Sequence, residues 1–155
     1  MNKVKEIIDI NEKSQITLDI MNALPKWFSP PENIQEKSMI HREYPFFAVF
    51  DKDKVIGFAT LKVHNNFTAE LYTIGILEDY HGMGLGYELL KACEKFCRSL
   101  GSEYLTVKTL DESADYEPYN STRGFYLKNG FIPLEVFPTF WDAENPCLFL
   151  AKFLR

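Results

Sequence analysis

A short run of glycines has the residue types and spacing of an anion-binding turn. The run is His81-Gly82-Met83-Gly84-Leu85-Gly86, between an apolar segment that ends at Leu77 and an amphipathic segment that continues to Leu100. The first four N–H groups of a helix have no partner within it, and the helix dipole adds partial positive charge there. Glycines let such amides approach phosphate oxygens without a Cβ atom in the way. The run therefore predicts a site that holds a pyrophosphate mainly on backbone amides.

Two familiar phosphate-binding motifs do not fit this spacing. A nucleoside-triphosphate P-loop ends in Gly-Lys-Ser/Thr, whereas Gly86 is followed by Tyr87 and Glu88. The dinucleotide motif Gly-x-Gly-x-x-Gly, started at Gly82 and Gly84, needs a third glycine where Tyr87 stands. The alternative is a strand-to-helix turn that binds no ligand, because short glycine motifs often occur by chance.

The elements that must position this turn follow from apolar periodicity. Alternating or continuous apolar runs predict strands over residues 4–10, 46–50, 55–63, 67–77, 104–110, 131–140 and 147–154. The helical period predicts helices over residues 14–24, 31–42, 84–100 and 121–128. The polar stretch 111–120 is expected to be a loop, and residues 141–146 to connect the last two strands. Without a repeat or linker, this order indicates one domain over residues 1–155 of the α/β (α+β) class.

The flanks of the glycine turn carry a resemblance to a known family. His81-x-x-Gly84-x-Gly86, with the strand from Glu70 to Leu77 before it, resembles the Gln/Arg-x-x-Gly-x-Gly/Ala signature of the GNAT N-acetyltransferase superfamily. Residues 122–131, Thr-Arg-Gly-Phe-Tyr-Leu-Lys-Asn-Gly-Phe, resemble its second signature, in which Phe-Tyr precedes x-Lys-x-Gly-Phe. The element order also matches, over nearly the whole chain. The resemblance implies the GNAT acyl-CoA N-acyltransferase fold, a mixed and mostly antiparallel sheet of six to seven strands flanked by about four helices.

The resemblance also implies acetyl-CoA as cosubstrate. Backbone groups at Ile76, Leu77 and Glu78 would then bind the pantetheine arm. The pyrophosphate would lie on the turn and the helix start, which comprise His81, Gly82, Met83, Gly84, Leu85, Gly86 and Tyr87. His81 stands where the family usually has Gln or Arg, so either its imidazole or its backbone alone would serve the phosphate. Asn120 is a further cofactor-binding candidate, next to the position where many members have a CoA-contacting asparagine.

Direct acyl transfer to an amine has two proton requirements. An alkylammonium, with a pKa of about 10.4, must lose a proton before attack, and a departing thiolate, with a pKa of roughly 8.5, benefits from gaining one. By the resemblance, Glu70 aligns with the general base of superfamily histone acetyltransferases and Tyr126 with the tyrosine often assigned as general acid. The alternatives are a solvated strand glutamate for Glu70 and a buried tyrosine with a hydrogen-bonded hydroxyl for Tyr126.

Three aromatic residues are candidates for the acceptor side. Trp27 and Phe28 lie in the linker between the first two helices, which commonly borders the acceptor site in GNAT folds, and each is otherwise a core anchor. Tyr72 follows Glu70 on the same strand face and either lines the cleft or packs in the core.

The charge balance excludes some partners and favours others. With 17 basic and 22 acidic residues, a net charge of -5 and no basic block, the chain is not expected to bind nucleic acid. The acidic surplus suits a cationic acceptor, and Asp142 and Glu144 either attract it or form a solvated loop. No apolar run approaches the roughly 20 residues of a membrane span, and the N-terminus lacks a signal-peptide pattern.

The cysteines and histidines give a second set of expectations. Cys93, Cys97 and Cys147 are an odd number without disulfide spacing, which indicates reduced thiols in the cytoplasm. Cys93 and Cys97 are one helical turn apart on an apolar face, so they are expected to be buried structural thiols rather than part of a metal site. His41 and His64 are expected on the surface.

These observations predict an N-acetyltransferase that moves an acetyl group from acetyl-CoA to a primary amine of a small molecule or peptide by direct attack in a ternary complex. The alternative is an acyl-CoA-binding sensor without efficient transfer. The presence of both Glu70 and Tyr126 favours the enzyme, and the assembly is left open between a monomer and a homodimer.

Overall fold

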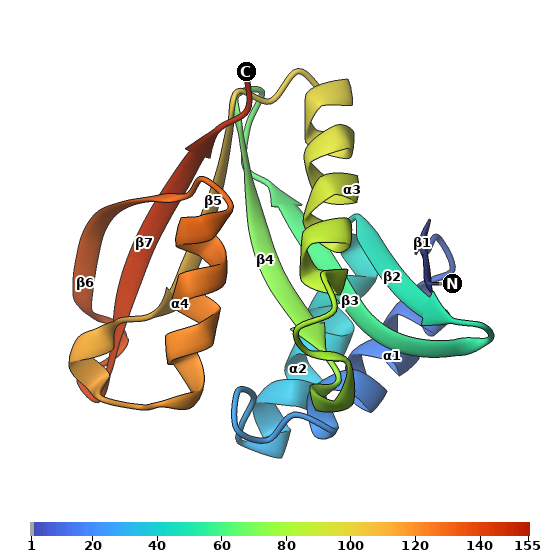
Figure 1. Cartoon of the computed structure of the whole chain (residues 1–155), viewed down its shortest axis with the longest axis horizontal. Helices are drawn as coiled ribbons and strands as arrows, with labels where there is room; N and C mark the ends of the chain where they lie inside the picture. Colours follow the sequence, from blue (N-terminus) through green and yellow to red (C-terminus); the bar gives the residue numbers. More distant parts are fainter. Residues whose placement is uncertain (1) are drawn as a thin grey trace.

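The computed structural model describes residues 2–155 and contains seven strands and four α-helices. In chain order these are β1 (Asn2–Glu6), α1 (Ile10–Asn22), α2 (Pro31–Ile40), β2 (Phe46–Asp51), β3 (Lys54–Val63), β4 (Thr68–Ile76), α3 (Leu85–Ser99), β5 (Tyr104–Leu110), α4 (Pro118–Lys128), β6 (Ile132–Asp142) and β7 (Asn145–Phe153). The strands form one sheet in the order β1-β2-β3-β4-β5-β7-β6 (Figure 1). The predicted mixed, mostly antiparallel sheet with about four helices is confirmed.

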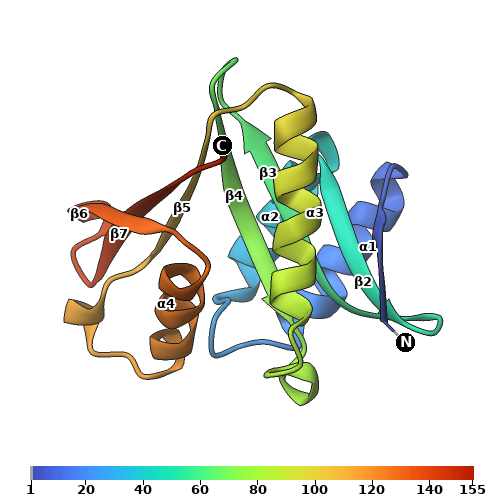
Figure 2. The same ribbon diagram turned by 45° about the horizontal axis from the view of Figure 1, so that its top comes forward.

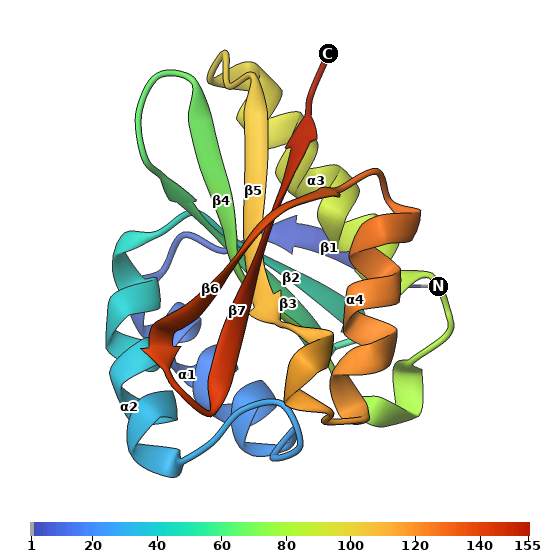
Figure 3. The same ribbon diagram turned by 90° about the vertical axis from the view of Figure 1, so that its left-hand side faces the viewer.

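Helices cover both faces of the sheet. Figure 3 shows α1 and α2 on one face and α3 and α4 on the other. The core on the α3 side includes Leu71, Leu89 and Leu105, whereas the core on the α1 side includes Ile20 and Phe58. Both faces of the central strands are therefore buried, which explains their nearly continuous apolar sequences.

The sheet opens between β4 and β5, its one parallel neighbouring pair among the described strands. The two strands pair only at Thr68↔Tyr104, Ala69↔Leu105 and Glu70↔Thr106. Beyond Glu70, β4 continues to Ile76 without β5 beside it, and the two ribbons diverge in Figures 1 and 2. The edge of β4 that faces β5 is thus uncovered along its second half, and Glu70 lies where the opening begins.

The boundaries predicted for the first strand and the first helix were wrong. β1 ends at Glu6, and α1 begins at Ile10 rather than at residue 14. The Asp9 side chain accepts a hydrogen bond from the Glu12 N–H (2.9 Å) and so caps α1 at its N-terminus. The apolar residues between Glu6 and Ile10 resemble a strand continuation in sequence but lead into a capped helix.

Two predicted loops are shorter than expected. Helix α4 begins at Pro118 instead of residue 121, because a proline in the first helical turn needs no N–H partner. Strand β6 continues to Asp142, and strand β7 already begins at Asn145. The turn between them is tight because Asp142 Oδ1 accepts from the N–H groups of Glu144 and Asn145 (both 2.9 Å). Asp142 therefore stabilises this turn, and whether it also attracts a cationic acceptor stays open between the two alternatives.

His41 was expected on the surface, and this expectation was wrong. Its ring is fully buried between α1 and β4, where Nδ1 lies 2.9 Å from Thr17 Oγ1 and Nε2 lies 3.0 Å from Thr73 Oγ1. Burial, and secondarily the Lys37 ammonium, lower the pKa of His41 from 6.5 to about 3. The ring is neutral at physiological pH and joins two elements through its hydrogen bonds.

This buried histidine predicts a pH-dependent loss of stability. The pKa of His41 is lower in the folded state than in the unfolded chain. Its contribution to the free energy of unfolding is therefore complete above pH 6.5 and is lost as the pH falls toward 3, by at most about 1.4 kcal/mol per pH unit. Urea unfolding of wild type and His41→Gln at several pH values between 7 and 4 measures this. The difference between the two is expected to shrink below pH 6.5.

Thr73→Val is the matched control, since it removes a hydrogen bond from the same site without removing the titrating group. Its unfolding free energy is expected to follow the wild-type pH dependence with a constant offset. Parallel curves for wild type and His41→Gln would contradict the prediction.

Candidate active site

Glu70 is a buried carboxylate with two cationic or donor partners. It is 4% exposed, and Oε1 accepts from His64 Nε2 (2.8 Å) and Lys108 Nζ (3.1 Å), while Oε2 accepts from Lys108 Nζ (3.1 Å). The alternative of a solvated strand glutamate was therefore wrong. His64 lies at the surface, as expected, with its side chain 34% exposed. A carboxylate oxygen has room for more than one donor, so Oε2 can accept a further hydrogen bond.

The strand alternation defines which side Glu70 faces. Its neighbours Ala69 and Leu71 belong to the core beneath α3, so Glu70 points to the α1–α2 side of the sheet. Lys108 joins it from β5, with Nζ 5.1 Å from the ring centre of Phe140 and 6.0 Å from that of Phe149.

Sequence reasoning missed Lys108 as a partner of Glu70. The one available sequence signal for this pairing was that Lys108 is a charged residue within the otherwise mostly apolar strand β5.

The open edge of β4 offers backbone groups to a ligand. Leu77 N–H donates to Ile56 O of β3 (2.9 Å), so the alternation of an antiparallel ladder turns the N–H and C=O of Ile76 toward the uncovered edge. The Ile76 carbonyl accepts from His81 Nε2 (2.6 Å), and the Leu77 carbonyl accepts from Tyr80 N–H (2.9 Å). Of the three residues expected to bind pantetheine, Ile76 therefore turns its N–H to the uncovered edge while its carbonyl is occupied by His81, and their binding roles stay predictions.

The glycine turn has the local geometry that its spacing predicts. Gly82 and Gly84 both have φ of +78°, and Gly84 directly precedes α3. The first intrahelical bond at this end joins Glu88 N–H to Gly84 O (3.1 Å), so the earlier amides of the first turn have no helical partner. Met83 and Tyr87 carry exposed side chains that leave the backbone accessible. Anion binding at this turn stays a prediction, as does the contribution of Leu85.

The two signature motifs meet in the structure. A Cβ atom on Gly86 would lie 3.0 Å from Cε1 of the Phe125 ring, so α3 and α4 approach closely at this glycine. The neighbouring Tyr126 is 5% exposed, and its ring packs against those of Phe125 and Phe131 at 5.6 Å.

The Tyr126 hydroxyl forms no hydrogen bond with another residue of 2–155, contrary to the alternative weighed from sequence. Burial, and then nearby Tyr119, raise the pKa of Tyr126 well above its ordinary value. The phenol is therefore a proton donor throughout the physiological pH range.

Three hydrogen bonds join the α1–α2 linker to the segment at the start of α4, and sequence reasoning missed them. The hydroxyls of Tyr116 and Tyr119 donate to the carbonyls of Lys26 and Trp27 (both 2.7 Å), and Trp27 Nε1 donates to Pro118 O (3.0 Å). No local spacing could have indicated these contacts, because Tyr119 and Trp27 are 92 positions apart.

The remaining site candidates have these surroundings. The Trp27 ring lies 5.5 Å from the ring of His81, so it borders the glycine turn as well as the linker. Phe28 packs on the α1-side core and contacts Gly75 of β4. Asn120 Oδ1 accepts from Arg123 within α4. Their binding roles stay predictions.

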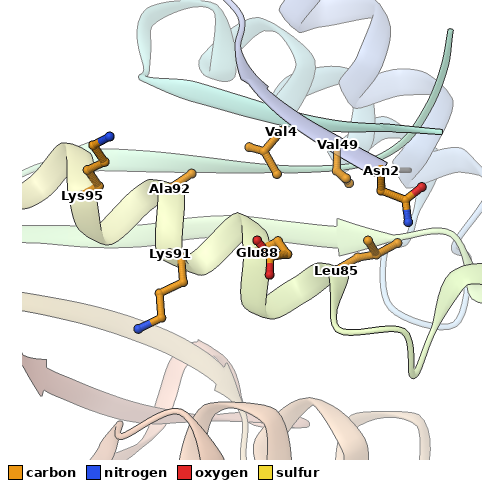
Figure 4. A pocket seen from close by; sticks show the side chains of 8 residues that line it. All are labelled: Asn2, Val4, Val49, Leu85, Glu88, Lys91, Ala92 and Lys95. Carbon is orange, nitrogen blue, oxygen red and sulfur yellow. The ribbon is translucent and has the colours of Figure 1, made fainter. Parts of the chain in front are cut away.

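A hollow in the surface lies away from Glu70 and Tyr126. It is a shallow pocket of about 320 Å³ between α3 and the strands β1 and β2, shown in Figure 4, where Asn2, Val4 and Val49 face Leu85 and Glu88. It contains no candidate catalytic group, and Lys91 and Lys95 at its side are exposed helix residues.

The cysteines and the described helices bear on the other expectations. Cys93, Cys97 and Cys147 are free and buried, and burial raises the pKa of Cys97 to about 11, so the burial expected of Cys93 and Cys97 is confirmed. Residues 2–155 contain no cluster of three or more His, Cys, Asp or Glu side chains suited to a metal ion. None of the helices in that range combines the length and apolarity needed to cross a bilayer.

The mixed sheet, its β4–β5 opening and the glycine turn define an acyltransferase fold. A model of the acetyltransferase (GNAT) family matches residues 13–131, and the chain therefore belongs to the GNAT acetyltransferase family. The family and the enzyme class predicted from sequence are confirmed. No curated protein matches the chain in sequence.

Solved structures share the fold at low sequence identity. A GNAT-family acetyltransferase from Desulfovibrio desulfuricans superimposes with a TM-score of 0.84 at 20% identity, over 100% of both chains. PaiA N-acetyltransferase from Thermoplasma acidophilum, in complex with coenzyme A, gives 0.76 at 21% identity over 99% of both chains. The ribosomal-protein-S18-alanine N-acetyltransferase from Escherichia coli gives 0.77 at 16% identity, over 99% of this chain and 94% of that one.

The contact between the signature motifs predicts a severe effect of Gly86→Val. The added side chain would collide with the Phe125 ring and displace the first turn of α3, at a cost of about 1–3 kcal/mol in unfolding free energy. Coenzyme A affinity is expected to fall at least about tenfold, since each tenfold corresponds to about 1.4 kcal/mol. Urea unfolding and calorimetric titration with coenzyme A measure the two effects.

Gly124→Ala is the control. Gly124 lies in the same helix as Phe125, and an added Cβ atom there would have no neighbouring atom within 4 Å. It is expected to keep coenzyme A affinity and to stabilise α4 by up to about 1 kcal/mol. Unchanged affinity in Gly86→Val would show that this packing does not position the turn.

Proposed function

We propose that this enzyme transfers the acetyl group of acetyl-CoA to a primary amine of a small molecule or peptide, by direct attack in a ternary complex. The observation that carries the proposal is the close approach of Gly86 to Phe125, which joins the glycine turn to α4, the helix that carries Tyr126, on the α3–α4 side of the sheet. Glu70 lies at the start of the β4–β5 opening and faces the opposite side. Donor and acceptor can therefore approach one another from the two faces.

The residues present fit a coenzyme A ligand. The Ile76 N–H faces the open strand edge as a donor, beside a carbonyl that already accepts from His81 Nε2, and the left-handed Gly82 and Gly84 add no side chains beside the amides that precede Glu88. Acetyl-CoA supplies the activated acyl group as a thioester. Coenzyme A in the PaiA structure supports the same ligand here.

Two side chains carry the proton transfers in this proposal. Glu70 accepts the proton of the acceptor ammonium at Oε2, directly or through water, which leaves the nitrogen lone pair free to attack. Tyr126 donates its phenolic proton to the thiolate that leaves, and the second proton that the nitrogen loses as the amide forms restores the phenol. His64 and Lys108 hold the carboxylate of Glu70 in place. We also propose a cytoplasmic location, in keeping with three free cysteines.

Thiol release from acetyl-CoA tests the proposal. The purified protein is assayed with polyamines, aminoglycosides, amino acids and peptides, and the acetylated product is identified by mass spectrometry. Amine-dependent release is the expected result. Tight binding of acetyl-CoA without release across the panel would instead support the acyl-CoA sensor.

A further inference from the structure

The α1–α2 side of the β4–β5 opening holds a lysine without an anionic partner. Lys37 of α2 extends to β4, where its Nζ donates to the Tyr72 hydroxyl (2.7 Å) and lies 4.2 Å from the centre of the Tyr72 ring. Both side chains are half-buried. No carboxylate of residues 2–155 forms an ion pair with Lys37, whereas Lys108 on the same side is paired with Glu70.

The hydroxyl of Tyr72 is left as a donor by this contact. Because its oxygen accepts from Lys37, the phenolic proton is free to bond another group, and Lys37 has two further N–H donors. The Tyr72 ring is fixed edge-on between Tyr44 (5.1 Å) and His41 (5.8 Å). Lys37 and Tyr72 therefore present donors from two side chains to one place, an arrangement that suits a carboxylate.

The charged groups around Tyr72 are not all paired. The negative charge of Glu70 is balanced by Lys108, and neutral His41 adds none. Lys37 therefore places on this side a positive charge that has no ion-pair partner among residues 2–155, although the chain carries a net charge of -5. The acidic composition favours a cationic acceptor, but an acceptor with several ammonium groups would place a second one against Lys37.

We propose that the acceptor is an amine that also carries a carboxylate, which Lys37 and Tyr72 bind while the amine lies at Glu70. Tyr72 follows Glu70 along the open edge of β4, so the two ends of such a molecule meet their partners on one strand. An amino acid and a peptide with an acidic residue at its N-terminus share this chemistry. The inference rests on the proposed amine acetylation.

Matched acceptors that differ only in charge test the inference. γ-Aminobutyrate is compared with γ-aminobutyramide, and aspartyl-alaninamide with asparaginyl-alaninamide, as steady-state acceptors with acetyl-CoA. The wild-type kcat/KM is expected to be at least about tenfold higher for the acid in at least one pair, mainly through KM, and the preference should decline with ionic strength. The pair that responds distinguishes a small amino acid from a peptide.

Variants assign the preference to the two side chains. Lys37→Met should abolish it by raising KM for the acid while leaving the amide constants within about twofold, and Tyr72→Phe should weaken it. Lys5→Met is the control. Lys5 lies on β1, and its Nζ makes a similar cation–π contact, 4.9 Å from the ring centre of Phe50 on β2. It should keep the full preference. Equal kcat/KM for acid and amide in both pairs, or an undiminished preference in Lys37→Met, would overturn the inference.

A binding measurement separates this inference from the proposed function. If no amine supports thiol release, the proposed function fails, and γ-aminobutyrate and aspartyl-alaninamide are titrated calorimetrically into the protein saturated with coenzyme A. Binding of either acid that is lost in Lys37→Met would still support the carboxylate site. No binding of either acid, or binding unchanged in Lys37→Met, would overturn it.

Discussion

Replacing Tyr126 with phenylalanine is expected to lower kcat for acetyl transfer by about 100- to 10,000-fold, the usual contribution of a general acid, while leaving coenzyme A affinity nearly unchanged. Burial raises the pKa of Tyr126, so the phenol stays protonated and able to donate at any pH from 6 to 9. The deficit should therefore be constant over that range. Since the hydroxyl has no hydrogen-bond partner among residues 2–155, its removal should leave no unsatisfied group and cost little stability.

Thiol release under saturating substrates gives kcat for Tyr126→Phe, and calorimetry gives the affinity for coenzyme A. Tyr119→Phe is the matched control, because Tyr119 is a half-buried tyrosine of the same helix, with its pKa raised to about 12, whose hydroxyl instead donates to Trp27 O. That variant should lose about 1 kcal/mol of stability with a much smaller change in kcat. Equal turnover of wild type and Tyr126→Phe would remove Tyr126 from the mechanism.

Glu70→Gln should reduce kcat for an alkylamine by about 100- to 10,000-fold near neutral pH, because the variant has no carboxylate to accept the ammonium proton. An alkylammonium with a pKa of about 10.4 is almost entirely protonated at pH 7, and its free-base fraction rises tenfold per pH unit below that pKa. The loss is therefore expected to be largest at low pH. It should nearly disappear for an amine whose pKa lies below the assay pH.

The pH–rate profile and a series of amines of falling pKa measure this dependence. Glu70→Gln also removes an ion pair with Lys108, so Glu94→Gln serves as the control: Glu94 is fully buried and pairs with Lys152 (2.6 Å) away from the opening. Glu94→Gln should lower the free energy of unfolding and leave the pH profile unchanged. A pH profile of Glu70→Gln that matches wild type would assign the base to another group.

The sequence alone determined the features that depend on residues close to one another along the chain. The apolar period of the segment from Leu85 to Leu100 and the glycines before it specified α3 and its open N-terminus, since backbone conformation there is set locally. The two signatures were enough to predict the family. Boundaries failed where one side chain decided them, as Asp9 does at the start of α1.

Tertiary structure alone decided the surroundings of the candidate site. Glu70 acquires Lys108, which is 38 positions away, because β5 returns beside β4 for only three residues before the strands part. Tyr72 acquires Lys37, which is 35 positions away, because α2 crosses the same face of the sheet. Periodicity along the chain shows which face a residue takes but not which side chain it meets there, since that depends on strand order and on where paired strands diverge. The glycine turn was therefore predictable from the chain itself, and the charge around the acceptor was not.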